Sequence, residues 1–129
     1  MYKKILVTLL IGSSLFAGNL NWESSYKVAK QKANEQNKEL FLFVSSPTCP
    51  ECNYMKKKIF TKDKVNEYIN KNYISYQFLH KSDEVPKDMK MWGIPRLYIS
   101  KGDDKVVAKK FGGLKADKLL KFLEQFKSK

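Results

Sequence analysis

The stretch LFLFVSSPTCPEC, residues 40–52, decides the fold of this chain. Its first five residues, Leu40 to Val44, form a continuous apolar run of strand length, which predicts a strand covered on both faces. The run ends in a polar loop, and Pro50 suits the first turn of a new helix because its missing N–H costs nothing there. The sequence therefore predicts a buried strand that leads directly into a helix, with Cys49 and Cys52 at the junction.

Helical and strand-like patterns alternate on both sides of this junction. A first helix is expected over residues 21–36, where a serine can cap the start and apolar residues recur at helical spacing: Trp22, Tyr26, Ala29 and Ala33. Strands are expected at residues 73–79, 97–99 and 106–108, helical pieces around residues 50–60, 65–69 and 114–126, and a short helix and loop over residues 83–92. This order predicts an α/β fold, a three-layer sandwich with a central mixed β-sheet flanked by helices.

Cys49 and Cys52 are the two cysteines of the chain, and their Cys-x-x-Cys spacing lets them form and break a disulfide within one helical turn. Cys49 is expected at the helix N-terminus, where unpaired backbone N–H groups and the helix dipole favour its thiolate. Cys52, one turn later, is expected to be more buried. The pattern predicts catalytic roles for both, with Cys49 as the nucleophile and Cys52 as the resolving thiol.

The cysteine pair has two other interpretations, half of a zinc site and an inert structural disulfide. A zinc site needs four ligands, and His80 is the one remaining nitrogen ligand of the usual kind. An inert structural disulfide is compatible with an exported protein, but a bridge that closes so short a loop constrains the unfolded chain little. Disulfide exchange is therefore the preferred chemistry, with no metal and no organic cofactor.

The chain resembles the thioredoxin superfamily over about residues 22–127. The resemblance rests on Cys49-Pro-Glu-Cys52 after a buried strand, on Gly93-Ile94-Pro95 some forty residues later, and on Phe111-Gly-Gly before a final helix. Met55 and Phe60 place it closest to a branch that includes small exported thioredoxin-like proteins. That branch also includes the C-terminal domain of the transmembrane thiol reductant of the periplasm.

The resemblance implies further site residues. Pro95 is expected to be a cis-proline beside the thiols, which leaves the backbone of Ile94 available to a substrate strand. Trp92 is expected either to form part of the substrate groove or to pack under the sheet. Arg96 is expected at the surface or beside an acidic partner, and His80 is expected to be exposed.

Two positions depart from the family pattern. Thr48 stands where the family prototype has tryptophan before the first cysteine, and Phe43 stands where it has a buried aspartate that accepts the proton of the resolving thiol. Glu51, between the cysteines, is expected to face solvent and to oppose thiolate formation slightly. The strong oxidants of the family carry histidine between their cysteines, so Glu51 favours a reductant.

Residues 1–18 have the pattern of a secretory signal peptide. Lys3 and Lys4 precede a short apolar run, and the small residues Ala17 and Gly18 follow it. The run is too short for a comfortable membrane span. The sequence predicts export to the periplasm, cleavage of residues 1–18 and a mature domain over residues 19–129; a buried first strand or an uncleaved anchor is the alternative.

The net charge of +12 comes from lysines spread along the expected helices, with one arginine. Readers of nucleic acid lean on arginine and on aromatic residues within basic patches, so a nucleic-acid partner is not expected. The expected partners are protein disulfide substrates and a membrane or periplasmic thiol that donates electrons to this protein. The chain is expected to be a monomer without stable membrane insertion after cleavage. The competing function is a non-catalytic binding module that uses the cis-proline groove.

Overall fold

Strand β1 (Glu39–Ser45) lies at the centre of the fold in the computed structural model, which describes residues 18–127. All seven of its residues are buried, as the apolar run predicts. It pairs in parallel with β2 (Tyr73–Leu79) and antiparallel with β3 (Arg96–Ser100). Strand β4 (Val106–Phe111) pairs antiparallel with β3, which gives the order β2-β1-β3-β4. The sheet is therefore mixed, as predicted.

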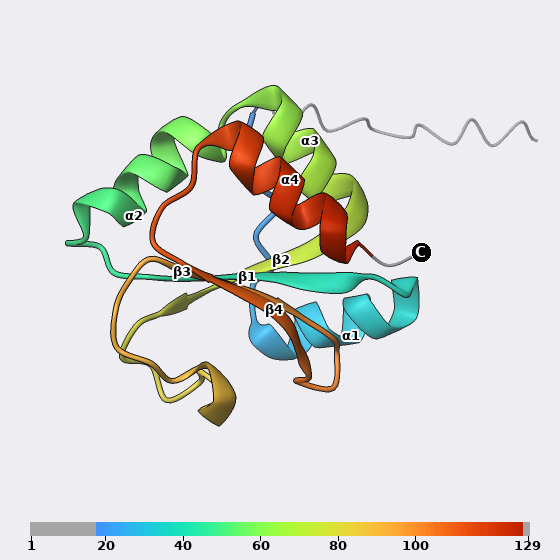
Figure 1. The fold of residues 1–129 in the computed structure, drawn as a ribbon. Coiled ribbons are helices and arrows are strands. Elements are labelled where there is room, and N and C mark those ends of the chain that lie inside the picture. Colours follow the sequence, from blue (N-terminus) through green and yellow to red (C-terminus); the bar gives the residue numbers. More distant parts are fainter. Residues whose placement is uncertain (1–17, 128–129) are drawn as a thin grey trace, which may run out of the picture.

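Helices cover both faces of this sheet (Figure 1). On one face lie α2 (Pro50–Tyr54), which continues directly into the π-helical turn η1 (Met55–Ile59), then α3 (Asp63–Asn72) and α4 (Ala116–Phe126). Helix α1 (Tyr26–Gln36) and the 3₁₀ turn η2 (Lys87–Met89) lie on the other face. The predicted three-layer α/β sandwich is confirmed.

Alternate side chains of β1 enter two separate cores, because successive residues of a strand point to opposite faces. Phe41 and Phe43 pack beneath α2, α3 and α4, and Leu40 and Leu42 pack against α1. The ring of Phe43 lies 5.0 Å from that of Phe60, edge-on to it. A continuous apolar run, rather than an alternating one, is what burial on both faces requires.

The first helix is shorter than the sequence predicts. It begins at Tyr26, and the Ser25 side chain caps it by accepting a hydrogen bond of 3.1 Å from the backbone N–H of Val28. Trp22 lies outside the helix in an isolated parallel bridge with Ser75. Its ring packs against the core on the opposite face of the sheet from α1. Assigning Trp22 to the α1 face was therefore wrong, since its helical spacing from Tyr26 is coincidental.

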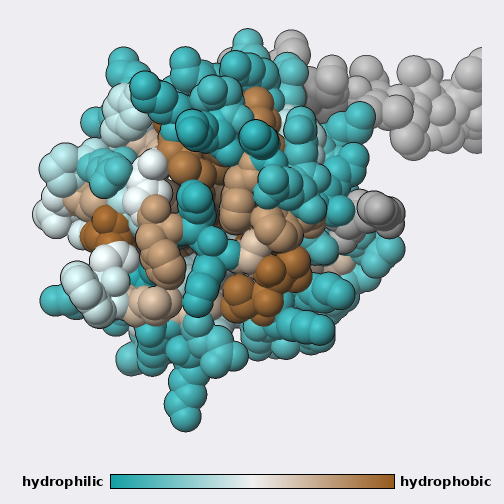
Figure 2. Space-filling model, viewed as in Figure 1, coloured by the Kyte–Doolittle hydropathy of each residue, from teal (hydrophilic) through white to brown (hydrophobic). Residues whose placement is uncertain are grey.

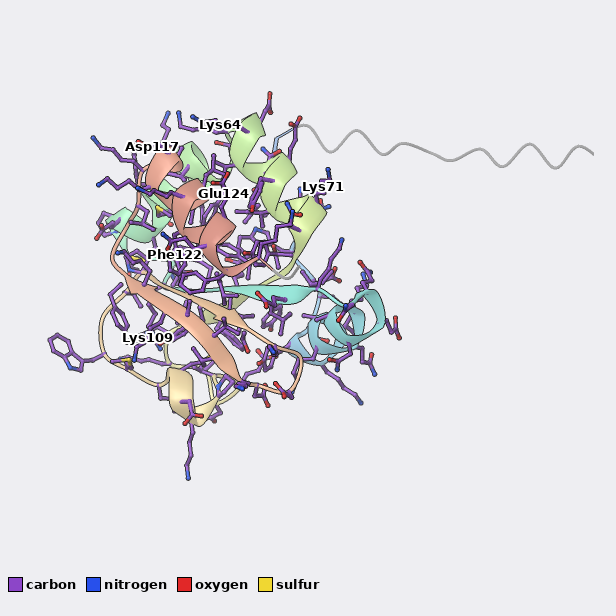
Figure 3. All side chains as sticks on the ribbon, turned by 45° about the vertical axis from the view of Figure 1, so that its right-hand side comes forward. Lys64, Lys71, Lys109, Asp117, Phe122 and Glu124 are labelled. Carbon is purple, nitrogen blue, oxygen red and sulfur yellow. A yellow bond between two sulfur atoms is a disulfide. The ribbon has the colours of Figure 1, made fainter. Side chains whose placement is uncertain are left out.

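The face shown in Figure 2 is largely hydrophilic, with apolar residues showing between α4 and β4. Lys64 and Lys71 project from α3, and Lys109 extends from β4 in a different part of the molecule (Figure 3). No helix within residues 18–127 is long and apolar enough to cross a lipid bilayer. The expected signal peptide lies outside the described residues except for Gly18.

Candidate active site

Cys49 and Cys52 form a disulfide at the start of α2, with their Cα atoms 5.2 Å apart. Cys49 is the N-cap of the helix, and its sulfur accepts a hydrogen bond of 3.1 Å from the backbone N–H of Cys52. Pro50 occupies the first helical turn, as its lack of a donor favours. The junction of strand and helix therefore aims backbone donors at the sulfur of Cys49, an arrangement that favours negative charge on that atom.

The two sulfurs differ in access to solvent. Cys49 is half-buried, whereas Cys52 has no exposed surface and belongs to the core that contains Met55 and Phe60. Apolar surroundings disfavour a thiolate, so Cys52 is held as the less reactive sulfur. An incoming disulfide can therefore reach Cys49 first.

The loop before β3 contains the expected cis peptide bond between Ile94 and Pro95. Pro95 is buried, and its carbonyl accepts a hydrogen bond of 2.9 Å from the backbone N–H of Gly112. Ile94 is half-buried and packs against both cores. Trp92 is 94% exposed, which excludes packing under the sheet and leaves its ring at the surface two residues before Ile94.

The Phe111-Gly-Gly segment links this loop to α2 through contacts that the sequence did not predict. Gly113 donates its backbone N–H to the Glu51 carboxylate at 2.8 Å, one residue after Gly112 binds Pro95. A Cβ atom on Gly113 would lie 2.8 Å from the same carboxylate oxygen, so alanine there would displace the end of the Glu51 side chain from this position. Because 62 residues separate Glu51 from Gly113, no local sequence pattern reveals the contact.

Phe43 fills the position where the family pattern has an acid, and it is fully buried among aromatic rings. Glu51 is exposed and engaged with Gly113. Within residues 18–127 there is no group of three or more histidine, cysteine, aspartate or glutamate side chains that could hold a metal ion. The described site therefore consists of two sulfurs, a helix terminus and the cis-proline loop.

Arg96 and His80 are placed differently from the sequence expectation. Arg96 is only 1% exposed, and its guanidinium contacts Nδ1 of His80 at 2.8 Å. It also donates to the carbonyl oxygens of Met89 and Gly93. His80 is accordingly half-buried rather than exposed. The acceptors of Arg96 are uncharged groups, mostly backbone carbonyls, which leave no charge pattern in the sequence, and for that reason its burial was not foreseen.

Comparison with known proteins agrees with this geometry. The family model of the thioredoxin-like domain matches residues 26–127, most of the chain. An uncharacterised protein from Archaeoglobus fulgidus is 32% identical over 72 residues, which cover 54% of this chain and 57% of that protein. The match thus spans little more than half of the length of that relative.

Solved structures share the fold at low sequence identity. A DsbH oxidoreductase has a TM-score of 0.65 and 21% identity, covering 84% of this chain and 85% of its own. The oxidised C-terminal domain of Neisseria meningitidis DsbD has a TM-score of 0.63 and 19% identity, covering 76% and 89%. A thioredoxin from Thermus thermophilus has a TM-score of 0.71 and 19% identity, covering 83% and 86%.

Proposed function

We propose that this chain, which belongs to the family of thioredoxin-like domains, is a thiol-disulfide oxidoreductase that acts as an exported reductant of protein disulfides with Cys49 as its nucleophile. The observation that carries this assignment of roles is the difference in burial between the two sulfurs at the start of α2. Cys49 is accessible and accepts a backbone N–H, whereas Cys52 lies wholly in the core.

The reaction that this geometry suits has two exchange steps. The thiolate of Cys49 attacks one sulfur of the substrate disulfide; that bond breaks, a mixed disulfide forms, and the first substrate thiolate leaves and takes up a proton. Cys52 then loses its proton and attacks the sulfur of Cys49, which releases the second substrate thiolate. Two electrons have passed to the substrate, and Cys49 and Cys52 are joined as in this structure.

Substrate binding is proposed for Ile94, Pro95 and Trp92. Ile94 and Cys49 pack against the same core, and an extended substrate segment placed along Ile94 would bring its sulfur towards Cys49. Trp92 offers a large apolar ring to the same segment, since 94% of its surface is exposed. Exposed aromatic rings are frequent anchors of protein contacts because they bury much surface with few rotatable bonds.

Reduction of insulin disulfides tests the assignment of the nucleophile. We expect the wild-type protein, supplied with a dithiol, to reduce insulin, and Cys49→Ser to be inactive. Cys52→Ser is the matched variant: it retains the first step and should accumulate a mixed disulfide through Cys49. Absence of activity in the wild-type protein with any reductant would favour the competing function of a non-catalytic binding module.

The direction of electron flow is tested by the redox potential measured against glutathione. Potentials of related proteins span roughly −270 to −120 mV, and they rise as the thiolate of the reduced form is stabilised. Glu51 places a negative charge between the cysteines, so we expect a value towards the reducing end. A potential near about −120 mV would assign the opposite direction.

Export follows from the proposed signal peptide over residues 1–18 and a mature domain over residues 19–129. Expression of the full chain in a bacterium, followed by separation of periplasm from cytoplasm, tests the proposal. We expect a shortened chain in the periplasmic fraction, with its new N-terminus near Asn19. An intact chain confined to the cytoplasm would contradict it.

A further inference from the structure

A basic cavity lies beside the loop that ends in Pro95, and the disulfide exchange described above does not use it. It has a volume of about 450 Å³ and opens to solvent. Its walls carry His80, Lys81, Lys90 and Arg96, with the carboxylate of Asp83 and the ring of Trp92. Three permanent cations thus face one carboxylate, which makes the cavity a place where negative charge is favoured.

Arg96 gives this cavity a fixed positive charge. Its side chain is 1% exposed, and neither of the two ion pairs found among residues 18–127 includes it. Backbone carbonyls of Met89 and Gly93 and the hydroxyl of Tyr98 accept its hydrogen bonds instead. These acceptors satisfy its N–H groups without supplying a full negative charge. A buried charge without a counter-ion is costly, and an anion entering the cavity would lower that cost.

Arg96 also sets the hydrogen-bonding state of His80. Because arginine has only donors, Nδ1 of His80 must accept the 2.8 Å hydrogen bond, and the ring hydrogen is then on Nε2. The imidazole is held in one tautomer that keeps a donor for a further partner. Lys81 and Lys90 add two ammonium groups, both on exposed residues at the cavity wall.

A second, smaller cavity shares His80 and Lys81 with the basic cavity and is also lined by Ser45–Pro47, the segment that leads to Cys49. The pairing of the strands explains this arrangement: the backbone N–H of His80 donates to the carbonyl of Ser45 at 2.9 Å. The basic cavity and the loop that leads to Cys49 therefore lie at the same edge of the sheet.

We propose that this cavity binds an aspartate or glutamate side chain of the protein substrate while the substrate disulfide lies at Cys49. The inference rests on the proposed function and extends it to a substrate class, disulfide-bearing segments with an acidic residue at a set distance from the reactive cysteine. Nε2 of His80 and the two lysines contact the carboxylate, and Arg96 acts as a positioning residue from beneath them.

The test uses short peptides that each carry one cysteine in a mixed disulfide with thionitrobenzoate, whose release is followed by absorbance. Aspartate is placed at each flanking position in turn, with asparagine at the same position as the neutral match. We expect kcat/KM for aspartate to exceed that for asparagine by about tenfold at one position only. Lys81→Gln and Lys90→Gln should each lower that ratio by about threefold, whereas the matched surface variant Lys118→Gln on α4 should not change it.

The outcomes separate this inference from its premise. The preference for aspartate could be equal at every position, or Lys118→Gln and Lys90→Gln could have equal effects. Either result would show that the preference comes from the overall charge of the protein, which would overturn the inference. Release from no peptide at all would defeat the proposed function and the inference together.

Discussion

Access to solvent distinguishes individual residues of the site that are close in sequence. Cys49 and Cys52 lie in one helical turn, yet the first is half-buried and the second has no exposed surface. Trp92 and Pro95 lie in one loop, yet the first is almost fully exposed and the second is buried. In each pair, one residue is buried, and the more exposed residue is the one that we propose meets the substrate.

Trp92→Ala tests the proposed substrate contact. Because the ring is 94% exposed, its removal should leave the thermal midpoint almost unchanged, while kcat/KM for insulin reduction falls by about fivefold. Steady-state insulin reduction and a thermal melt measure the two quantities. Trp92→Phe, which retains an aromatic ring, should recover most of the activity. A large fall in thermal midpoint with unchanged kcat/KM would show that the ring has only a structural role.

The sequence predicted correctly those residues whose surroundings come from their neighbours in the chain. The Cys-x-x-Cys pair, Pro50 at the helix start and the cis bond before Pro95 all follow from short motifs. It failed at Arg96, because a lone arginine after a loop gives no sign that carbonyl oxygens several residues earlier will surround it. His80 was misplaced for the same reason, since its partner is Arg96.

Contacts between elements hold the site together, and most of them join segments distant in sequence. The segment after β4 binds the cis-proline loop through Gly112 and α2 through Gly113, so three elements meet around the disulfide. The positions of β1 and β2 and the start of α2 were predictable from apolar runs and proline, but the π-helical turn at Met55–Ile59 was not. The start of α1 was not, because Trp22 repeats the helical spacing while bridging to Ser75.

Gly113→Ala tests the link between α2 and the segment after β4. The new methyl group would lie 2.8 Å from the Glu51 carboxylate and displace it, so we expect a loss of about 1 kcal/mol in the free energy of unfolding. Urea denaturation of Gly113→Ala, Glu51→Ala and the double variant gives the coupling energy. The cost of Gly113→Ala should largely vanish in the Glu51→Ala protein, and strictly additive losses would refute the link.

Tyr76 on β2 makes stability depend on alkaline pH. Burial, with a hydrogen bond of 2.7 Å to Glu84, raises the pKa of Tyr76 from its ordinary value of 10.0 to about 12. Because the folded pKa is the higher one, the stability contributed by neutral Tyr76 is complete below about pH 10 and is lost as the pH rises towards 12. Burial raises the pKa of Tyr26 as well, so its contribution decreases in the same direction.

The urea midpoint measured at several pH values between about 9 and 11.5 tests this dependence. Tyr76→Phe should show a smaller decrease over this range than the wild-type protein, because the variant has no hydroxyl to ionise. The comparison cancels the effect of the lysines, which both proteins share. Identical decreases in the two proteins would show that Tyr76 does not contribute.

In the whole molecule, strand β1 packs against both cores and ends at the edge of the sheet from which the chain leads to Cys49. Residues of β1 alternate between the core beneath α2, α3 and α4 and the core against α1, and the strand then ends in the loop that leads to Cys49 (Figure 1). The loops after β1 and β2 and the loop before β3 all meet at this edge. The sequence predicts this architecture because each element carries its own pattern, whereas the basic cavity is lined by the connection between β2 and β3 and by Arg96, where no periodic pattern predicts the packing.

The proposed mechanism requires that Cys49 is the accessible, ionised sulfur and that Cys52 is the buried one. Alkylation of the fully reduced protein with iodoacetamide at neutral pH, with each site quantified by mass spectrometry, tests it most directly. We expect the alkylation rate of Cys49 to be well above that of cysteine in an unfolded peptide, and Cys52 to stay largely unmodified. Equal modification of both, or a Cys49 rate no higher than that of the unfolded peptide, would contradict it.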